Sequence, residues 1–223
     1  MARVAVCLSG CGVFDGSEIH EAVLTLLALD QAGAQAVCCA PNVDQAAVVN
    51  HLTREPASSE RRNVLTESAR IARGAIVDLA SVKAGDIDAL IFPGGYGAAT
   101  NLSTFAKDGP ECQVNPEVER LVGEMLAAGK PIGAICIAPA MLARITGRRA
   151  PGSRLTIGNE RETAAAIERM GAVHVECACD SFVVDEKNKI VSTPAYMLGK
   201  GPASVFEGIR KLVNEVLRLA RSS

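Results

Sequence analysis

Short apolar runs alternate along the chain with longer stretches in which apolar residues recur every three or four positions. Short runs bounded by glycine or polar residues predict β-strands, and the longer periodic stretches predict α-helices. The predicted strands are Arg3–Ser9, Ala34–Ala40, Ala75–Leu79, Asp88–Phe92, Pro131–Ile135, Leu155–Ile157, Val173–Glu176, Ser181–Val184 and Ile190–Thr193. The predicted helices are Ser17–Ala32, Asn63–Ala72, Val114–Ala128, Ala138–Thr146, Arg161–Met170 and Pro202–Leu219.

The alternation of strands and helices predicts an α/β fold with a mainly parallel sheet and helices on both faces. No linker and no internal repeat divides the sequence, so we expect a single domain over residues 1–223. Residues 180–193 contain two strands around a polar turn, which predicts a small β-hairpin. Ligands bind such sheets beyond the carboxyl ends of the strands. The predicted strand ends to search are Ser9, Phe92, Ile135 and Thr193.

Charge and hydropathy exclude some classes of partner. The 223 residues carry 23 Lys and Arg against 25 Asp and Glu, and this near-neutral balance argues against nucleic acid as a partner. No apolar run approaches the roughly 18 residues of a membrane span, so we expect no membrane partner. The apolar run Val4–Leu8 is too short for the core of a signal peptide, and we therefore expect a cytoplasmic protein.

The chain contains eight cysteines, a density far below that of a small disulfide scaffold. In a reducing compartment most of them are expected to be small buried side chains in the core. Their spacings differ from the CxxC pairs of zinc sites, so we predict no metal. Seven of the eight fit this description: Cys7, Cys11, Cys38, Cys39, Cys112, Cys177 and Cys179.

Cys136 occupies a different kind of position, directly after the predicted strand Pro131–Ile135. The small residues Ala134 and Ala138 stand two places before and two places after it. This spacing is typical of a nucleophile elbow, where a strand turns sharply into a helix. The sulfur would then lie at a helix N-terminus, whose dipole favours the reactive thiolate. The alternative is an inert cysteine at the end of a strand.

The first predicted helix begins with acidic residues. Carboxylates are favoured in the first turn of a helix, which by itself explains Glu18. Glu21 lies one turn further, at the border of an apolar stripe that includes Val23 and Leu27 and is predicted to be buried. From there it could meet the Cys136 elbow, or remain a solvated helix residue. His20 could reach the same place or lie on the surface.

A glycine-rich turn follows the predicted strand Asp88–Phe92 and contains Gly94 and Gly95. Such a turn can present backbone N–H groups to an anion or an oxyanion. It matches neither the Walker loop nor the dinucleotide-binding fingerprint. Opposite a nucleophile, it would supply the donors that acyl chemistry needs.

Three fragments together resemble the ThiJ/PfpI superfamily, which has the class I glutamine amidotransferase-like fold. They are Gly16–Val23, Phe92–Gly95 and Ala134–Cys136. The wider segments Ser9–Leu24, Cys136–Leu142 and Thr193–Leu198 resemble its ElbB subgroup, whose members are described as glyoxalases linked to isoprenoid biosynthesis. The likeness covers nearly the whole chain.

The resemblance implies a three-layer flavodoxin-like sandwich, commonly a homodimer, that needs no cofactor. It also implies that Cys136 is the nucleophile and that Glu21 handles its protons. The amides of Gly95 and Ile137 would form an oxyanion pocket, with Gly94 beside them. The residues that we expect to shape the pocket for a small dicarbonyl substrate are Glu18, His20, Asn101, Pro194 and Tyr196.

The sequence departs from the protease-like members of the superfamily, because Ile137 rather than a histidine follows Cys136. A cysteine and a carboxyl group without a histidine suit proton transfer on a small carbonyl compound. The predicted function is therefore a glutathione-independent glyoxalase, which converts glyoxal or methylglyoxal into the 2-hydroxy acid through a cysteine hemithioacetal.

Two alternatives stay open at this point. An oxidisable Cys136 with a neighbouring carboxylic acid could be a redox sensor without turnover. A glutamine amidase or peptidase would need a histidine, and His174 is the candidate because His174–Glu176 has the His-x-Glu pattern of amidotransferases. That segment is predicted to lie inside a strand, which disfavours the second alternative.

Overall fold

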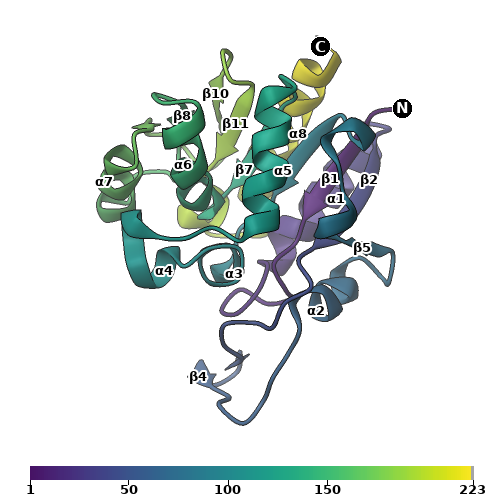
Figure 1. The fold of residues 1–223 in the computed structure, drawn as a ribbon, viewed down its shortest axis with the longest axis vertical. Helices are drawn as coiled ribbons and strands as arrows, with labels where there is room; N and C mark the ends of the chain where they lie inside the picture. The colour runs from purple at the N-terminus through teal and green to yellow at the C-terminus, as the bar shows by residue number, and fades with distance from the viewer. Residues whose placement is uncertain (222–223) are drawn as a thin grey trace.

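The computed structural model describes residues 1–221, so the last two residues of the expected domain lie outside the described part. Its central sheet has the strand order β10-β11-β7-β6-β1-β2-β5 (Figure 1). Neighbouring strands pair in parallel except β10 and β11, which form the predicted hairpin. The strands are β1 (Arg3–Cys7), β2 (Gln35–Ala40), β5 (Ile76–Asp78), β6 (Ala89–Phe92), β7 (Ile132–Ile135), β10 (Val183–Asp185) and β11 (Ile190–Thr193).

Two smaller sheets lie outside the central one. β8 (Arg154–Leu155) pairs in parallel with β9 (Val173–His174), so these two predicted strands contact each other and do not extend the central sheet. β3 (Val49–Asn50) and β4 (Glu55–Pro56) form a short antiparallel pair, which the sequence did not predict. This pair lies in the loop after β2, well beyond the carboxyl edge of the sheet, at the bottom of Figure 1.

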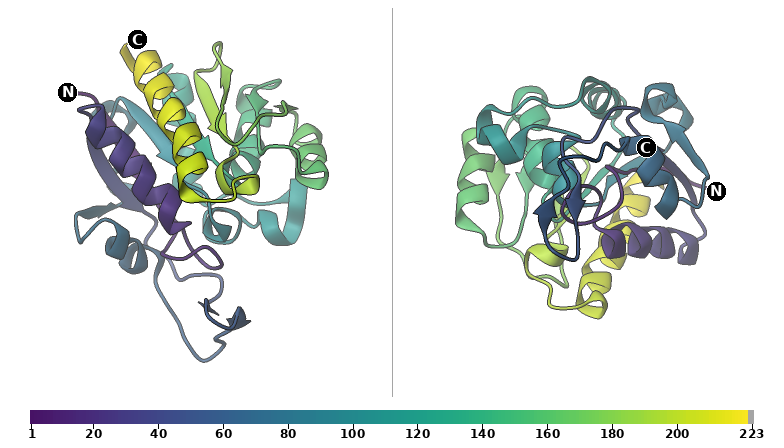
Figure 2. Two further views of the ribbon diagram at one scale, coloured as in Figure 1. Left: turned by 180° about the vertical axis from the view of Figure 1, so that it is seen from behind. Right: turned by 90° about the horizontal axis from the view of Figure 1, so that it is seen from below.

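Helices cover both faces of the sheet. α1 and α8 lie side by side on one face, and α5 and α6 cover the other, as the views from the front and from behind show (Figures 1 and 2). The helices are α1 (Ile19–Gln31), α2 (Val64–Ile71), α3 (Tyr96–Thr100), α4 (Phe105–Asp108), α5 (Pro116–Ala127), α6 (Ala138–Arg149), α7 (Arg161–Arg169) and α8 (Pro202–Arg221). The short helices α3 and α4 were not predicted, because one turn of helix has too few positions to show a period.

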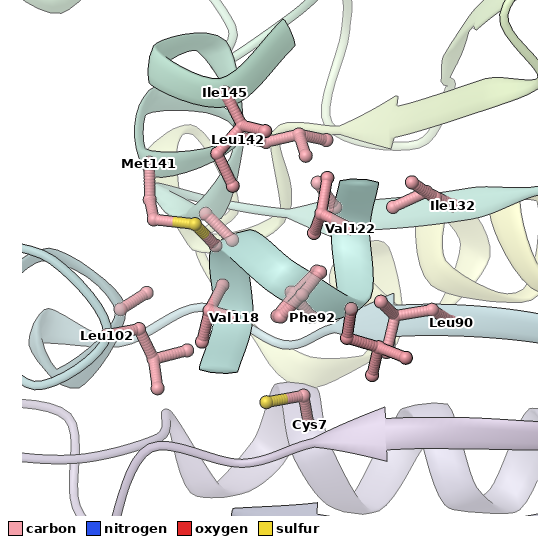
Figure 3. Packing of buried hydrophobic residues seen from close by; sticks show 14 of the residues in the cluster. Cys7, Leu90, Phe92, Leu102, Val118, Val122, Ile132, Met141, Leu142 and Ile145 are labelled. Atoms are coloured by element: carbon pink, nitrogen blue, oxygen red, sulfur yellow. The ribbon is translucent and has the colours of Figure 1, made fainter. Parts of the chain in front are cut away.

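The core is divided by the sheet into two layers. Because side chains alternate along a strand, Val4 and Val6 pack under α1 and α8, whereas Cys7 packs under α5 and α6. Figure 3 shows the second layer, where Phe92 and Leu90 of β6 meet Val118 and other apolar side chains of α5 and α6. β6 and β7 are buried along their whole length, as expected for strands covered on both faces.

The predicted fold class is confirmed: an α/β sandwich with a mainly parallel sheet, helices on both faces and a small antiparallel hairpin. The strands β11, β7, β6 and β1 are consecutive in the sheet and parallel. Their carboxyl ends therefore meet at one edge, and the residues that follow them lie close together.

Candidate functional site

Cys136 lies in the sharp turn between β7 and α6. Its φ of +62° is in the left-handed region, which non-glycine residues rarely adopt and which stores backbone strain. Its N–H donates to the Thr193 carbonyl at 2.9 Å, which fixes the turn to the end of β11. The residue is only 8% exposed. This is the conformation of a nucleophile elbow, which presents a side chain beyond the edge of the sheet.

Glu21 lies in the first turn of α1 and is fully buried. Glu18 is the N-cap of this helix, and its carboxylate accepts the N–H of Glu21 at 2.7 Å. The two oxygens of Glu21 accept backbone N–H groups from different elements, Oε2 from Gly94 at 3.0 Å and Oε1 from Tyr196 at 3.1 Å. The carboxyl group therefore joins the end of β6 to the segment after β11.

The buried stripe of α1 differs from the prediction. Val23 and Leu27 are exposed by 46% and 40%, whereas Glu21 and Thr25 are buried. The reason is tertiary: α1 packs against α8, and the face it turns inward carries Glu21, Thr25 and Leu29 together with two alanines. Glu21 is thus in the interior of the protein and not at the border of an apolar stripe.

Gly94 brings the thiol and the carboxyl group together. A Cβ at this position would lie 2.4 Å from the Cβ of Cys136 and 2.6 Å from Oε2 of Glu21. Real Cβ atoms do not approach other atoms so closely, so only glycine fits between the two side chains. The Glu21 carboxyl and the Cys136 thiol face each other in a hydrogen-bonding contact.

Two backbone N–H groups point at the sulfur. Those of Gly95 and Ile137 donate toward Cys136 and lower its pKa. Gly95 has a φ of +97°, and a Cβ there would meet the Glu18 nitrogen at 2.3 Å. The glycine is therefore required by both its conformation and the close approach of the loop before α1. Backbone N–H donors that converge beside a nucleophile are the kind of group from which an oxyanion hole is built.

Burial controls the protonation of this pair. It raises the pKa of Glu21 from 4.5 to about 8, against the opposing effect of the Tyr196 N–H. Burial, together with the Glu21 carboxyl, also raises the pKa of the Cys136 thiol well above its ordinary value. A helix N-terminus favours the thiolate form of Cys136, but desolvation disfavours it. The sequence alone does not reveal this desolvation. At neutral pH both groups hold their protons.

A cavity of about 550 Å³ opens above the sulfur. Its lining includes Cys136, Gly95 and Ile137, together with the predicted pocket residues Glu18 and Tyr196. The walls come from the loop after β1, the α3–α4 region, the start of α7 and the short 3-10 helix Ala195–Met197. The cavity therefore stands at the carboxyl edge of the sheet, where ligands of such folds bind.

The remaining predicted pocket residues lie behind this lining and support it. His20 Nδ1 is 2.7 Å from the Tyr196 hydroxyl, so His20 positions a residue of the wall. Pro194 is buried and precedes the 3-10 helix that carries Tyr196. Asn101 is also buried, and its side chain amide donates to the carbonyls of Ser9 and Asp15. These three residues were expected to contact the substrate, but they lie outside the lining of the cavity and support its wall.

The sequence did not predict several of the lining residues, among them Phe105, Glu162, Thr163 and Met197. Glu162 and Thr163 lie at the start of α7, a helix that follows the predicted strand Leu155–Ile157. A helix start after a strand belongs to the carboxyl edge of an α/β fold, and this signal could have indicated them. Phe105 belongs to the unpredicted helix α4 and had no such signal.

His174 is not part of this site. Its Nε2 accepts the Ile157 N–H at 3.4 Å in the small β8–β9 sheet. Within residues 1–221 no group of three or more His, Cys, Asp or Glu side chains is placed to hold a metal ion. No helix in the same range has the length and hydropathy to cross a membrane.

The model of the DJ-1/PfpI family matches residues 11–196, a segment that includes Glu21, the glycine turn and Cys136. The chain belongs to the DJ-1/PfpI family. The predicted superfamily, with its class I glutamine amidotransferase-like fold, is thereby confirmed.

Relatives in the DJ-1/PfpI family match almost the whole chain. Human "Glutamine amidotransferase-like class 1 domain-containing protein 3, mitochondrial" is 49% identical over 227 residues, covering 98% of this chain and 83% of the human protein. Zebrafish "ES1 protein, mitochondrial" is 38% identical over 235 residues, covering 97% and 86%. The crystal structure of an Ehrlichia chaffeensis "isoprenoid biosynthesis protein with amidotransferase-like domain" superposes with a TM-score of 0.92 at 40% identity, covering 98% and 99%.

These relatives correct one expectation. The prediction of a cytoplasmic protein is wrong, because the human and zebrafish proteins are both named as mitochondrial. The prediction rested on an apolar run too short for the core of a signal peptide and on the lack of an apolar run as long as a membrane span. Neither feature distinguishes the cytoplasm from another compartment in which thiols stay reduced.

Proposed function

We propose that this DJ-1/PfpI family member is a glyoxalase that uses neither glutathione nor a cofactor. It converts glyoxal or methylglyoxal into the corresponding 2-hydroxy acid. The observation that carries the proposal is the convergence of a strained elbow cysteine, a buried carboxyl group and two backbone donors beneath a cavity. Each of these groups has a task in the isomerisation of a dicarbonyl compound.

In the first step the ionised form of Glu21, the minor form at neutral pH, takes the thiol proton while the sulfur of Cys136 adds to the aldehyde carbon. The carbonyl electron pair moves to oxygen, where the N–H groups of Gly95 and Ile137 stabilise the negative charge. Glu21 then gives this proton to the oxygen, which yields the hemithioacetal and leaves Glu21 ionised for the second step. A general base with a pKa of about 8 is well matched to proton transfer near neutral pH.

In the second step Glu21 removes the proton from the carbon that bears sulfur, and an enediol forms. The proton returns to the neighbouring carbon, so the first carbon is oxidised, the second is reduced, and no external oxidant is needed. The product is a thioester of the 2-hydroxy acid. Water then cleaves the C–S bond, which releases the acid and restores the thiol.

The test compares wild type, Cys136→Ser and Glu21→Gln for glyoxal consumption without glutathione, with glycolate measured by NMR. We expect kcat/KM to fall about 1,000-fold or more in Cys136→Ser and about 100-fold in Glu21→Gln. Cys177→Ser and Glu117→Gln, which change residues outside the cavity, are matched controls that should keep full activity. Full activity in both site variants would refute the mechanism.

The glutamine amidase or peptidase alternative is less well supported. Such hydrolases pair the cysteine with a histidine, and within residues 1–221 the lining of the cavity contains none. The redox-sensor alternative is supported by the carboxyl group beside the sulfur. Burial of the thiol and its raised pKa oppose it, because sensor cysteines are accessible thiolates.

Three further proposals rest on the relatives and on the surface. The Ehrlichia protein's name supports membership of the ElbB-type subgroup and a link to isoprenoid biosynthesis, although no residue of the cavity has chemistry specific to that pathway.

A homodimer is supported by Ile19, Val23 and Leu27, apolar residues spaced four apart that are each at least 40% exposed on α1. A mitochondrial location is proposed from the names of the curated relatives.

A further inference from the structure

The cavity above Cys136 is acidic. Two carboxylates, Glu18 and Glu162, stand in its lining. Within residues 1–221 the lining contains no lysine, arginine or histidine. A cavity lined by charges of one sign repels ligands of that sign, and the effect falls as salt screens it.

The N-termini of α1 and α7 at the cavity do not supply a compensating site for an anion. α7 begins at the wall, but its first N–H groups are already used, because Glu160 accepts those of Glu162 at 2.9 Å and Thr163 at 2.7 Å. In α1 the N–H of Glu21 is likewise taken by Glu18. The N–H groups of Gly95 and Ile137 are engaged at the reacting centre beside Cys136. A carboxylate or phosphate on the substituent of a substrate would therefore lose its hydration without gaining a partner.

Most of the other lining residues are apolar, and the cavity is large. Val13, Ala99, Phe105, Ile137 and Met197 contribute to it, together with tyrosine rings. About 550 Å³ lies within the range of cavities that hold drug-sized ligands, and it greatly exceeds the need of a two- or three-carbon aldehyde. A phenyl or branched alkyl group on the substrate would be buried against this wall.

We propose that the cavity selects uncharged α-oxoaldehydes with an apolar or aromatic substituent and rejects those with an anionic group, and that Glu162 is a specificity-determining residue. This proposal specifies the substrates of the proposed glyoxalase. The preference among α-oxoaldehydes therefore rests on that proposed function. The same repulsion would speed release of the product, because the 2-hydroxy acid leaves as an anion.

The first experiment measures kcat/KM at low ionic strength for methylglyoxal, phenylglyoxal, 4-carbamoylphenylglyoxal and 4-carboxyphenylglyoxal. We expect phenylglyoxal to exceed methylglyoxal about tenfold, from burial of the ring. The carboxylate should be worse than the carboxamide of equal size by about tenfold, and Glu162→Lys should remove most of that difference. Glu168→Lys, on the same helix but outside the lining, makes the same charge change and should leave the ratio unaltered.

The second experiment needs no turnover. Iodoacetamide and iodoacetate have the same size and differ in charge, and their rates of reaction with Cys136 are followed by mass spectrometry of the peptide that contains it. We expect the amide-to-acid rate ratio to exceed that of glutathione, to fall in Glu162→Lys and to fall at high salt. The ratio in Glu168→Lys should equal that of wild type.

The two experiments separate the two proposals. Turnover of every aldehyde with no penalty for the carboxylate would overturn the selectivity while the glyoxalase function stands. No turnover of any aldehyde, with the expected alkylation ratios, would overturn the glyoxalase function while the acidic selectivity of the cavity stands. An alkylation ratio equal to that of glutathione and unchanged in Glu162→Lys would refute the role of Glu162.

Discussion

The turn at Cys136 and the strand pair that holds Cys7 and Cys39 are two regions of buried thiols with opposite properties. Cys7 and Cys39 are opposite each other on β1 and β2 and are fully buried. Their contact, followed by burial, raises the pKa of Cys7 well above its ordinary value. At Cys136, burial and the Glu21 carboxyl likewise raise the pKa of the thiol well above its ordinary value.

A buried thiol with a raised pKa is therefore not enough to identify a reactive cysteine. In the β1–β2 pair the sulfurs point at backbone carbonyls, Cys7 at Leu8 and Cys39 at Val6, which are acceptors and cannot stabilise a thiolate. At Cys136 the neighbours are a carboxyl group and two N–H donors, and a cavity opens above them. The partners of the sulfur and its access to a ligand distinguish the two regions.

Among substitutions that leave both cysteine regions chemically intact, the largest effect is expected from removing the space that lets Cys136 face Glu21. Gly94→Ala places a Cβ against both side chains, so the thiol and the carboxyl group must move apart. A displacement of about 1 Å is enough to lower kcat/KM for glyoxal about 100-fold. Activity and circular dichroism are measured together, so that loss of the site is separated from loss of the fold.

The matched control for this substitution is Gly85→Ala. A Cβ at Gly85 has no neighbour within 4 Å, and its φ is not positive. We expect unchanged activity and unchanged stability. Equal activity of Gly94→Ala and Gly85→Ala would contradict the close packing of thiol, turn and carboxyl group.

The second prediction concerns how the free energy of unfolding depends on pH, which differs between the two regions. Glu21 is protonated up to about pH 8 in the folded protein, but ionises near pH 4.5 in the unfolded chain. Its contribution to stability is thus fully present below pH 4.5 and is lost as pH rises through about 8. The wild-type free energy of unfolding, from urea titrations, should fall by a few kcal/mol over this range relative to that of Glu21→Gln. Parallel curves for the two proteins would show that Glu21 titrates normally.

The smallest effect concerns the β1–β2 pair. Cys7→Ala removes a buried sulfur in the core beneath α5 and α6, as its position in Figure 3 shows. We expect a loss of about 1–2 kcal/mol in the free energy of unfolding, with kcat/KM unchanged. The thiol of Cys7 titrates well above pH 8, so this loss should be constant from pH 5 to 8. If Cys7→Ala lost activity while its stability stayed unchanged, Cys7 would have a catalytic role and the proposed difference between the two regions would be wrong.

Much of the fold and the centre of the site could be predicted from local pattern. The strand before Cys136, the small residues around it and the glycine turn are all short-range features, and each is found where it was expected. The face of α1 could not be predicted in this way, because Glu21 faces inward while Val23 and Leu27 face outward. Which side of a helix is buried depends on its neighbour α8, more than 170 residues away in sequence.

The lining of the cavity shows the same limit. Asn101 was expected to contact substrate, but its hydrogen bonds to Ser9 and Asp15 place it behind the wall. Glu162 was not predicted as a pocket residue, although it stands in the lining of the cavity. Both results depend on how loops after different strands pack on one another, and such contacts leave no period or motif in the sequence.

The sequence by itself determined the α/β fold, its single elbow cysteine and the glycine turn, because hydrophobic periodicity and small-residue spacing act over a few positions. The tertiary structure alone decided that Glu21 is buried against Cys136 and that two N–H groups point at the sulfur. It also decided that the cavity is acidic. These properties depend on desolvation and on groups from β1, β6, β7 and β11 meeting at one edge, and both arise only when the chain has folded.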